Sequence, residues 1–175
     1  MNIENYSNID KSFEKVKYSI KTQLRKVVTE KYRNKFKEKL SLYSDESKLF
    51  LYSKLKSSID LEKYWSELTS FKNRQILTKF RTSDHCFQIE TGRYKNIPRQ
   101  QRLCNICKVV EDECHFLLTC KLNEQKRKEL LETIKLDSPD FEHYTSFQKV
   151  NFLLNPKSTL LPVVCTFVKQ SVALI

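Results

Sequence analysis

Five residues that can bind a metal ion lie within a stretch of 17 residues. They are Cys104, Cys107, Cys114, His115 and Cys120. Two cysteines separated by two residues can hold one ion from a tight turn, and a second close pair can complete the four-ligand shell of a structural zinc site. Free cysteines are also common in hydrophobic cores, but burial alone would not place four of the chain's six cysteines in this stretch. The pattern therefore predicts one structural Zn²⁺ ion.

The third ligand is either Cys114 or His115, which are adjacent in the sequence. Adjacent side chains on a helix point about 100° apart, so only one of the two can face the ion. His115 and Cys120 would lie about 140° apart on a regular helix, so both can bind only if a helix begins near His115 and is finished or distorted by Cys120. We expect Cys104, Cys107, His115 and Cys120 to be the ligands, with Cys114 as the alternative. Four protein ligands leave no open position, which argues against hydrolytic zinc chemistry.

The positive charge of the chain is concentrated before these residues. The formal net charge is +11, and residues 1–103 carry all of this excess, with 23 Lys and Arg against 12 Asp and Glu. Residues 104–175 carry nine of each. Such an asymmetry favours an anionic partner, most often nucleic acid, bound by the first half of the chain. A solvated, lysine-rich surface without a partner would give the same count.

The zinc segment itself, residues 104–120, is acidic. Three thiolates and a neutral imidazole leave a Zn²⁺ site with one negative charge, and the run from Glu111 to Glu113 adds three against one positive charge from Lys108. The segment then carries about −3, and an acidic surface is not expected to lie on phosphates. We expect it to fold an irregular segment and to hold the preceding basic stretch in place.

That basic stretch is the expected contact surface for DNA or RNA. Residues 71–103 hold eight Lys and Arg against two acidic residues, and Gly92 and Pro98 mark irregular backbone within them. The residues expected to contact nucleic acid are Lys79, Arg81, Arg93, Lys95, Arg99 and Arg102.

The elements that must position these residues are predicted to be helices. Charged residues make up 30% of the chain and hydrophobic residues 39%, and the single glycine is too few for a turn-rich β-sandwich or a phosphate-binding loop. Residues 11–39 carry an apolar stripe at helical spacing, from Phe13 to Val28, on an otherwise basic helix. We expect an all-α protein, with a basic amphipathic helical arm over residues 1–43 whose apolar face packs on the core, and a helical zinc-binding domain over residues 44–175.

Shorter helical patterns follow along the second part of the chain. They span residues 49–59, 71–80, 123–136, 145–155 and 160–175. In the second of them, Phe71 is expected to face inward with Leu77 and Phe80. The last is too short for a membrane span and is interrupted by Lys169 and Gln170, so we expect no membrane anchor.

The N-terminus has no apolar core that would make it a secretory signal, so the cysteines are expected to be reduced or bound to metal. We therefore expect an intracellular protein, in the nucleus rather than the cytoplasm.

Residues 79–127 also follow the pattern of a known family. An Arg-x-Ser-x-His stretch begins at Arg81, Ile-Glu-x-Gly-Arg-Tyr begins at Ile89, Glu-Asp-Glu-x-His-Phe begins at Glu111, and Arg127 follows the last cysteine. In this order the motifs resemble the zinc-binding region at the C-terminal end of LINE-like (non-LTR) retrotransposon reverse transcriptases. The resemblance implies the same four zinc ligands, and a region that helps to bind target DNA or template RNA.

The chain lacks the catalytic parts of such a protein. It contains no polymerase or endonuclease domain, and its seven aspartates are scattered, with no paired-aspartate motif for two-metal phosphoryl transfer. We therefore expect a non-catalytic fragment or remnant, without a small-molecule substrate, in which His85 has a structural hydrogen-bonding role. The alternative is a structural or protein-interaction module with no affinity for nucleic acid.

Overall fold

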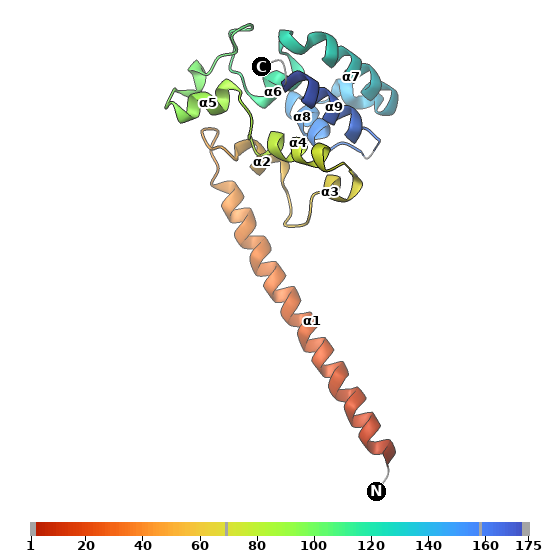
Figure 1. Cartoon of the computed structure of the whole chain (residues 1–175). Coiled ribbons are helices and arrows are strands. Elements are labelled where there is room, and N and C mark those ends of the chain that lie inside the picture. The colour runs from red at the N-terminus through yellow and green to blue at the C-terminus, as the bar shows by residue number, and fades with distance from the viewer. Residues whose placement is uncertain (1–2, 69, 158, 173–175) are drawn as a thin grey trace. The chain divides into compact units, whose positions relative to one another are not determined.

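The structure, a computed structural model, describes residues 3–68, 70–157 and 159–172, and the regular elements within these ranges are helices joined by turns and irregular segments (Figure 1). An isolated bridge between Leu103 and Val110 is the one β-type pairing in this part of the chain. The predicted all-α class is therefore confirmed. The chain divides into two compact units, Met1–Leu42 and Tyr43–Ile175, and this division falls one residue before the predicted boundary.

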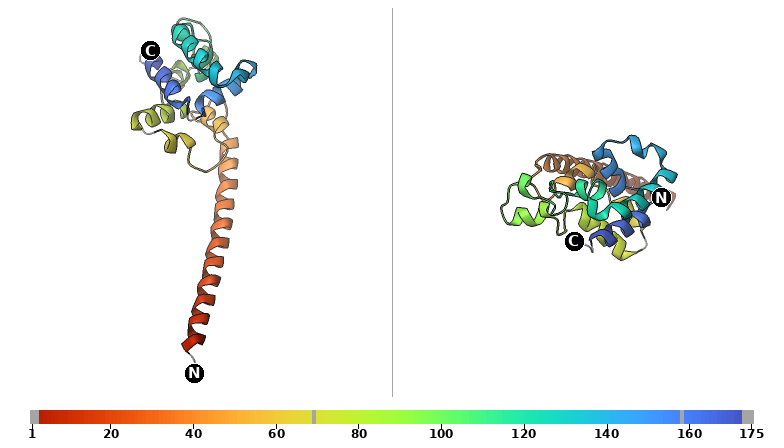
Figure 2. Two further views of the ribbon diagram at one scale, coloured as in Figure 1. Left: turned by 90° about the vertical axis from the view of Figure 1, so that its right-hand side faces the viewer. Right: turned by 90° about the horizontal axis from the view of Figure 1, so that it is seen from above.

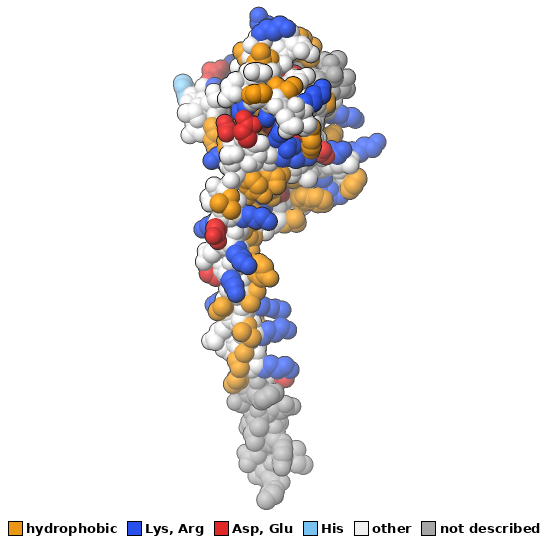
Figure 3. Space-filling view, turned by 90° about the vertical axis from the view of Figure 1, so that its left-hand side faces the viewer, with side chains coloured by type: hydrophobic (Ala, Val, Ile, Leu, Met, Phe, Trp, Pro, Cys, Tyr) orange, Lys and Arg blue, Asp and Glu red, His pale blue; other side chains and the backbone are white. Residues whose placement is uncertain are grey.

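The first unit is a single long helix, α1 (Ile3–Ser41). Each described side chain in its apolar stripe is at least half exposed. These side chains are Val16, Ile20, Leu24, Val27 and Val28. Phe13 lies outside the residues whose side chains are described. Hydrophobic side chains run along α1 beside Lys and Arg in Figure 3, so this helix presents an apolar and a basic face together.

The second unit contains the remaining helices. They are α2 (Phe50–Leu55), α3 (Lys63–Glu67), α4 (Phe71–Arg81), α5 (Gln88–Tyr94), α6 (Glu113–Leu118), α7 (Glu124–Asp137), α8 (Ser146–Leu154) and α9 (Leu161–Val172). Three short 3₁₀ segments, Arg99–Gln101, Lys121–Asn123 and Pro139–His143, lie between them. The predicted helices over 123–136 and 145–155 agree with α7 and α8 to within about one residue. The predicted helix over 49–59 is shorter, and α3 and α5 were not predicted.

Side-chain caps fix where several of these helices begin. The hydroxyl of Ser70 accepts a hydrogen bond from the backbone N–H of Asn73 at the start of α4. Thr145 and Gln148 form a reciprocal capping box at the start of α8. Each cap satisfies backbone donors that would otherwise lack a partner in the first turn.

The core of the second unit forms around α9, which packs against both α4 and α7, while α6 packs against α8 (Figures 1 and 2). Leu77 of α4 and Ile134 of α7 are fully buried, as is Leu117 of α6. Phe71 is 64% exposed, contrary to the prediction. At about 100° per residue it lies about 120° from Leu77 around α4, so it cannot share the buried face.

Candidate metal centre

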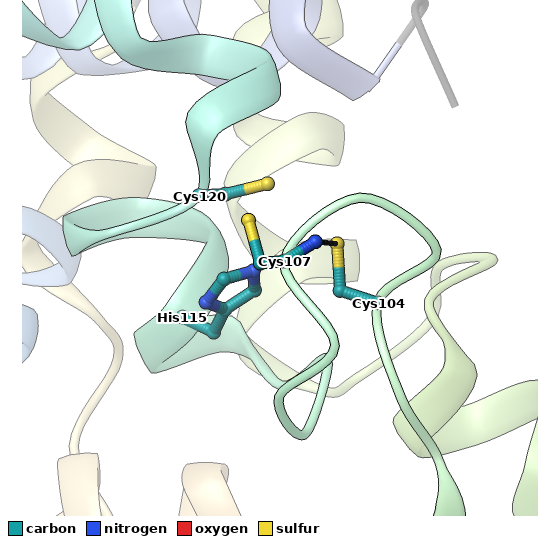
Figure 4. A group of neighbouring side chains, drawn as sticks. All are labelled: Cys104, Cys107, His115 and Cys120. Atoms are coloured by element: carbon teal, nitrogen blue, oxygen red, sulfur yellow. Dashed lines mark hydrogen bonds between the residues drawn. The ribbon is translucent and has the colours of Figure 1, made fainter.

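The structure brings four of the five candidate ligands together. The ligand atoms of Cys104, Cys107, His115 and Cys120 all lie within 4.8 Å of one another (Figure 4). Two sulfur atoms bound to the same tetrahedral zinc ion lie about 3.8 Å apart, so the cluster needs only small adjustments to enclose one ion. Cys114 is not part of the cluster and instead packs, partly buried, against the hydrophobic core.

A tight turn holds the first two thiols beside each other. The backbone N–H of Cys107 donates to the Cys104 sulfur over 3.5 Å, and the N–H of Lys108 donates to the Cys104 carbonyl over 2.9 Å. Lys108 has a φ of 57°, in the left-handed region, which reverses the chain. The Cys104 N–H then pairs with the carbonyl of Val109 over 2.8 Å, which closes the loop.

The two ends of the helix α6 position the other two ligands, His115 near its start and Cys120 just beyond its end. The carboxylate of Asp112 caps it by accepting a 2.9 Å hydrogen bond from the N–H of His115. At the other end, the N–H groups of Thr119 and Cys120 both donate to the His115 carbonyl. Cys120 has extended backbone angles and lies beyond the helix, so its thiol can approach the same point as the imidazole of His115.

The imidazole of His115 has one nitrogen left for an ion. Its Nδ1 lies 3.0 Å from the hydroxyl of Thr119, whereas its Nε2 is buried with no hydrogen-bond partner among the described residues. Burial lowers the pKa of His115, which favours the neutral imidazole that metals bind. With Nδ1–H donating to Thr119, the lone pair of Nε2 is free. A bound cation would remove the cost of leaving this nitrogen unpaired, so the residues fit a metal.

The surroundings of the thiols also suit a cation. Burial raises the pKa of Cys120 to about 11, so the metal-free chain keeps this thiol protonated at neutral pH. The backbone N–H of Lys121, 3.3 Å from the Cys107 sulfur, lowers the pKa of that thiol. Buried Arg127 donates to the Cys120 carbonyl over 2.8 Å, and its charge acts on the thiols of Cys120 and Cys107. This guanidinium would offset the single negative charge of a Cys₃His site that holds a divalent ion.

The acidic run beside the ligands has partners within the domain: Glu111 and Asp112 are partly buried, and Glu113 is buried. A Glu111 carboxylate oxygen accepts a 2.7 Å hydrogen bond from the N–H of Gln88. Asp112, besides capping α6, lies 2.9 Å from a guanidinium nitrogen of Arg99. Glu113 is buried, and its carboxylate is engaged by two side chains of the loop after α4. All three carboxylates thus have a hydrogen-bond or ion-pair partner within the domain.

Two side chains hold the buried carboxylate of Glu113. The hydroxyl of Ser83 donates to it, and Nε2 of His85 lies 3.1 Å from it. Burial by itself would raise the pKa of Glu113, but His85 and Ser83 outweigh this effect and keep the pKa below its usual value. His85 also stacks on Phe87 with a centroid distance of 4.0 Å, so the structural role expected for this histidine agrees with its contacts.

Two of the predicted nucleic-acid contacts are buried, so this part of the prediction is wrong. Arg81 has no exposed surface; it donates to the Leu154 carbonyl over 2.6 Å and forms a 3.0 Å ion pair with Glu62. Arg102 is 5% exposed and pairs with Glu46 over 2.7 Å. Both guanidinium groups are committed to the fold, because a buried charge is costly unless it is paired.

The other four predicted contacts differ in exposure. Arg93 is partly buried and pairs with Glu90, and Arg99 is partly buried between Asp112 and Asp45. Lys79 is exposed, 4.0 Å from Asp84, and Lys95 is exposed with no ion pair among the described residues. Of the six predicted contacts, these two lysines are therefore the ones most open to a partner.

Thr119 and Arg127 support the site, but Thr119 was not predicted as part of it, and Arg127 was named only as a position of the family pattern. Thr119 lies four residues after His115, the spacing at which side chains meet on a helix, and this was the available signal for it. The position of Arg127 beside Cys120 depends on the turn between α6 and α7, so sequence spacing alone could not place it.

No protein-family model matches the chain, and no curated protein or solved structure matches it either. The fold and the site define its class by themselves: an all-α protein with a Cys₃His cluster that could hold a metal ion. Within the described ranges, no helix is both long enough and apolar enough to cross a membrane.

Proposed function

We propose that the Cys₃His cluster holds one structural Zn²⁺ ion. Three thiolates and one imidazole form a donor set typical of structural zinc, and harder cations such as Mg²⁺ and Ca²⁺ prefer oxygen ligands. The unpaired Nε2 of His115 beside the three sulfurs supports this assignment.

Native mass spectrometry with and without a chelator tests the proposal. One zinc ion per chain is expected. Cys114→Ser should retain the ion, since Cys114 lies outside the cluster, whereas His115→Ala should weaken binding by at least about tenfold. The reverse pattern in these two variants would contradict the ligand assignment.

We further propose that the zinc-bound chain is a non-enzymatic nucleic-acid-binding protein. The observation that carries this proposal is the surface of α1, where residues 14–41 hold ten Lys and Arg against three acidic residues. Only Lys17 and Arg33 of these ten form an ion pair with a described residue. Exposed, unpaired cations in a row favour contact with a phosphate backbone, independent of base sequence.

The resemblance of residues 79–127 to the zinc region of LINE-like reverse transcriptases supports the same class of function. We propose a non-catalytic relative of that region, acting on nucleic acid in the nucleus. The closed four-ligand cluster and the internal use of the acidic run agree with a role in folding and binding rather than in catalysis.

Salt-dependent binding to labelled oligonucleotides tests the nucleic-acid proposal. A triple variant of α1, Lys21→Gln, Arg25→Gln and Lys26→Gln, should lower affinity. It should also reduce the slope of log K against log salt by about 0.9 for each phosphate of duplex DNA that the helix no longer neutralises. A matched control replaces three exposed lysines of the second unit, Lys63, Lys128 and Lys169, by Gln. Affinity that is absent at moderate salt, or equal in the two triple variants, would overturn the proposed role of α1.

A second candidate is a protein-interaction module, and the exposed apolar stripe of α1 favours it. Val16, Ile20 and Leu24 are each more than half exposed. An amphipathic helix of this kind can lie in the apolar groove of a partner protein. If the wild-type chain binds no oligonucleotide, the protein-interaction module remains as the candidate. The apolar variant carries Val16→Ser, Ile20→Ser and Leu24→Ser. If it still binds oligonucleotides whereas the triple charge variant of α1 does not, the nucleic-acid proposal is favoured.

A further inference from the structure

A small surface around the metal cluster combines exposed aliphatic and basic side chains. Ile106 is 52% exposed, Val109 is 48% exposed and Leu122 is 38% exposed. Lys108 and Lys121 stand between them in the sequence and are also exposed. These five residues are called the metal-loop face below.

The cluster itself holds the metal-loop face together. Ile106 and Lys108 flank the ligand Cys107, whose sulfur accepts a 3.3 Å hydrogen bond from the N–H of Lys121. Val109 is fixed through its carbonyl, which accepts from the N–H of Cys104. Two chain segments, before and after α6, therefore meet at one point because their residues bind the same cluster.

The charge that this face presents is positive. The carboxylates of Glu111, Asp112 and Glu113 have other partners, Gln88, Arg99 and Ser83. Neither Lys108 nor Lys121 forms an ion pair with any described residue. The metal-loop face thus offers exposed aliphatic side chains together with two unpaired lysines, which complements a partner that has flat apolar groups joined by anionic links.

We propose that the metal-loop face binds unpaired nucleotides of a single-stranded nucleic acid. The aliphatic side chains of Ile106, Val109 and Leu122 lie against base faces, and Lys108 and Lys121 contact the flanking phosphates. Base faces are accessible in a single strand, whereas in a duplex they are stacked on one another. This inference rests on the proposed nucleic-acid function and adds to it the form of nucleic acid recognised.

A protein partner fits this face less well. Stable protein interfaces need roughly 800 Å² from each partner, which is much more than five side chains around one loop provide. A strand of nucleic acid needs only one or two nucleotide contacts at each place it touches.

Fluorescence anisotropy with the full, zinc-loaded chain tests the inference. The probes are labelled single-stranded oligo-dT and oligo-rU and a DNA duplex of equal length, all at the same moderate salt. Ile106→Ser with Val109→Ser should weaken binding to the single strands by about tenfold, because the apolar area that two aliphatic side chains place against bases is lost, and should change duplex affinity by less than about twofold. The matched control is Leu136→Ser, an exposed leucine on α7 (89% exposed), which should change neither.

Each outcome is informative. The double variant must retain one zinc ion by native mass spectrometry, and its exposed positions make this the expected result. Equal weakening for single strand and duplex, or no weakening for either, overturns the inference while the proposed function stands. Binding to no oligonucleotide at any salt overturns both, and would leave the face to a protein partner.

Discussion

The two nitrogen atoms of His115 have separate tasks in the cluster. Nδ1 forms a hydrogen bond with the hydroxyl of Thr119, the residue that directly follows α6, which leaves Nε2 for the ion. A hydrogen bond of this kind fixes the tautomer and the orientation of the ring, so it contributes to metal affinity without touching the metal. Thr119 is therefore expected to act as a positioning residue.

Thr119→Val should weaken zinc binding by about tenfold to hundredfold, because the ring loses its orienting hydrogen bond while the side chain keeps its volume. Competition with a chromophoric chelator measures the affinity. Thr133→Val is a matched control, since the hydroxyl of Thr133 also bonds to a backbone carbonyl of its own helix, that of Glu129, but lies in α7 outside the cluster. Equal effects of the two variants would show that Thr119 does not orient the ligand.

Zinc affinity should rise with pH. In the metal-free chain the pKa of Cys120 is about 11 because the thiol is buried, so this thiol must lose its proton when the ion binds. Each proton released on binding makes the apparent affinity rise by about tenfold per pH unit while the pH lies below the pKa of that thiol. Titration calorimetry in buffers of different ionisation enthalpy counts the protons. An affinity independent of pH between 6 and 8 would contradict thiolate ligation.

At the scale of the elements, Arg81 joins three segments of the second unit. It lies at the end of α4, donates to the carbonyl of Leu154 at the end of α8, and pairs with Glu62 just before α3. Its guanidinium also lies over the ring of Tyr64, 5.4 Å from the centroid. These contacts explain why a residue predicted to bind nucleic acid is instead inside the fold.

Arg81→Ala should destabilise the second unit by about 3–5 kcal/mol, since it removes a large buried side chain, leaves the Leu154 carbonyl without its donor and leaves Glu62 with Lys56 as its remaining cationic partner. Urea unfolding followed by circular dichroism measures the change. Lys79→Ala, on the same helix but exposed, should change stability by less than about 0.5 kcal/mol. An Arg81→Ala variant that is as stable as the wild type but binds nucleic acid more weakly would reverse this assignment of roles.

The sequence predicts the elements with strong periodicity and the ligands with close spacing. Both α7 and α8 follow from their apolar stripes, and the four ligands follow from a pattern confined to 17 residues. The helices α3 and α5 have five and seven residues, too few for a stripe, and are held by burial of side chains such as Tyr64 and Ile89. Such short helices depend on tertiary contacts that the local sequence does not show.

The buried arginines were missed for a related reason. Arg102 pairs with Glu46, 56 positions away, and Arg81 pairs with Glu62, so no local pattern reveals either partner. A charge count assigns every arginine to the surface, although the fold buries three of them, Arg81, Arg102 and Arg127. The partners of the acidic run at 111–113 were missed in the same way, because its contacts with Gln88, Arg99 and His85 form only in the folded domain.

At the scale of the whole chain, the metal cluster and the hydrophobic core of the second unit are connected through α6. His115 belongs to the cluster, whereas the next two residues, Phe116 and Leu117, are buried in the core at 1% and 0% exposure. Phe116 stacks on Phe87 with a centroid distance of 4.6 Å, and α6 packs against α8. A change in the position of α6 must therefore reach residues far from the ligands.

Removal of zinc by a chelator should consequently destabilise all of Tyr43–Ile175 and not only the metal loop. Hydrogen exchange followed by mass spectrometry is expected to show faster exchange at the N–H of Cys104, which donates to the Val109 carbonyl, at the N–H of Lys121, which donates to the Cys107 sulfur, and also in α8 and α9. The thermal transition of this unit should move to lower temperature, because structural zinc contributes roughly 10–16 kcal/mol in small finger peptides and some of that energy is transmitted through α6. The helix α1, a separate compact unit with no metal ligand among its described residues, is the internal control and should exchange at an unchanged rate. Faster exchange confined to residues 99–120, with an unchanged transition temperature, would show that the core folds independently of the metal.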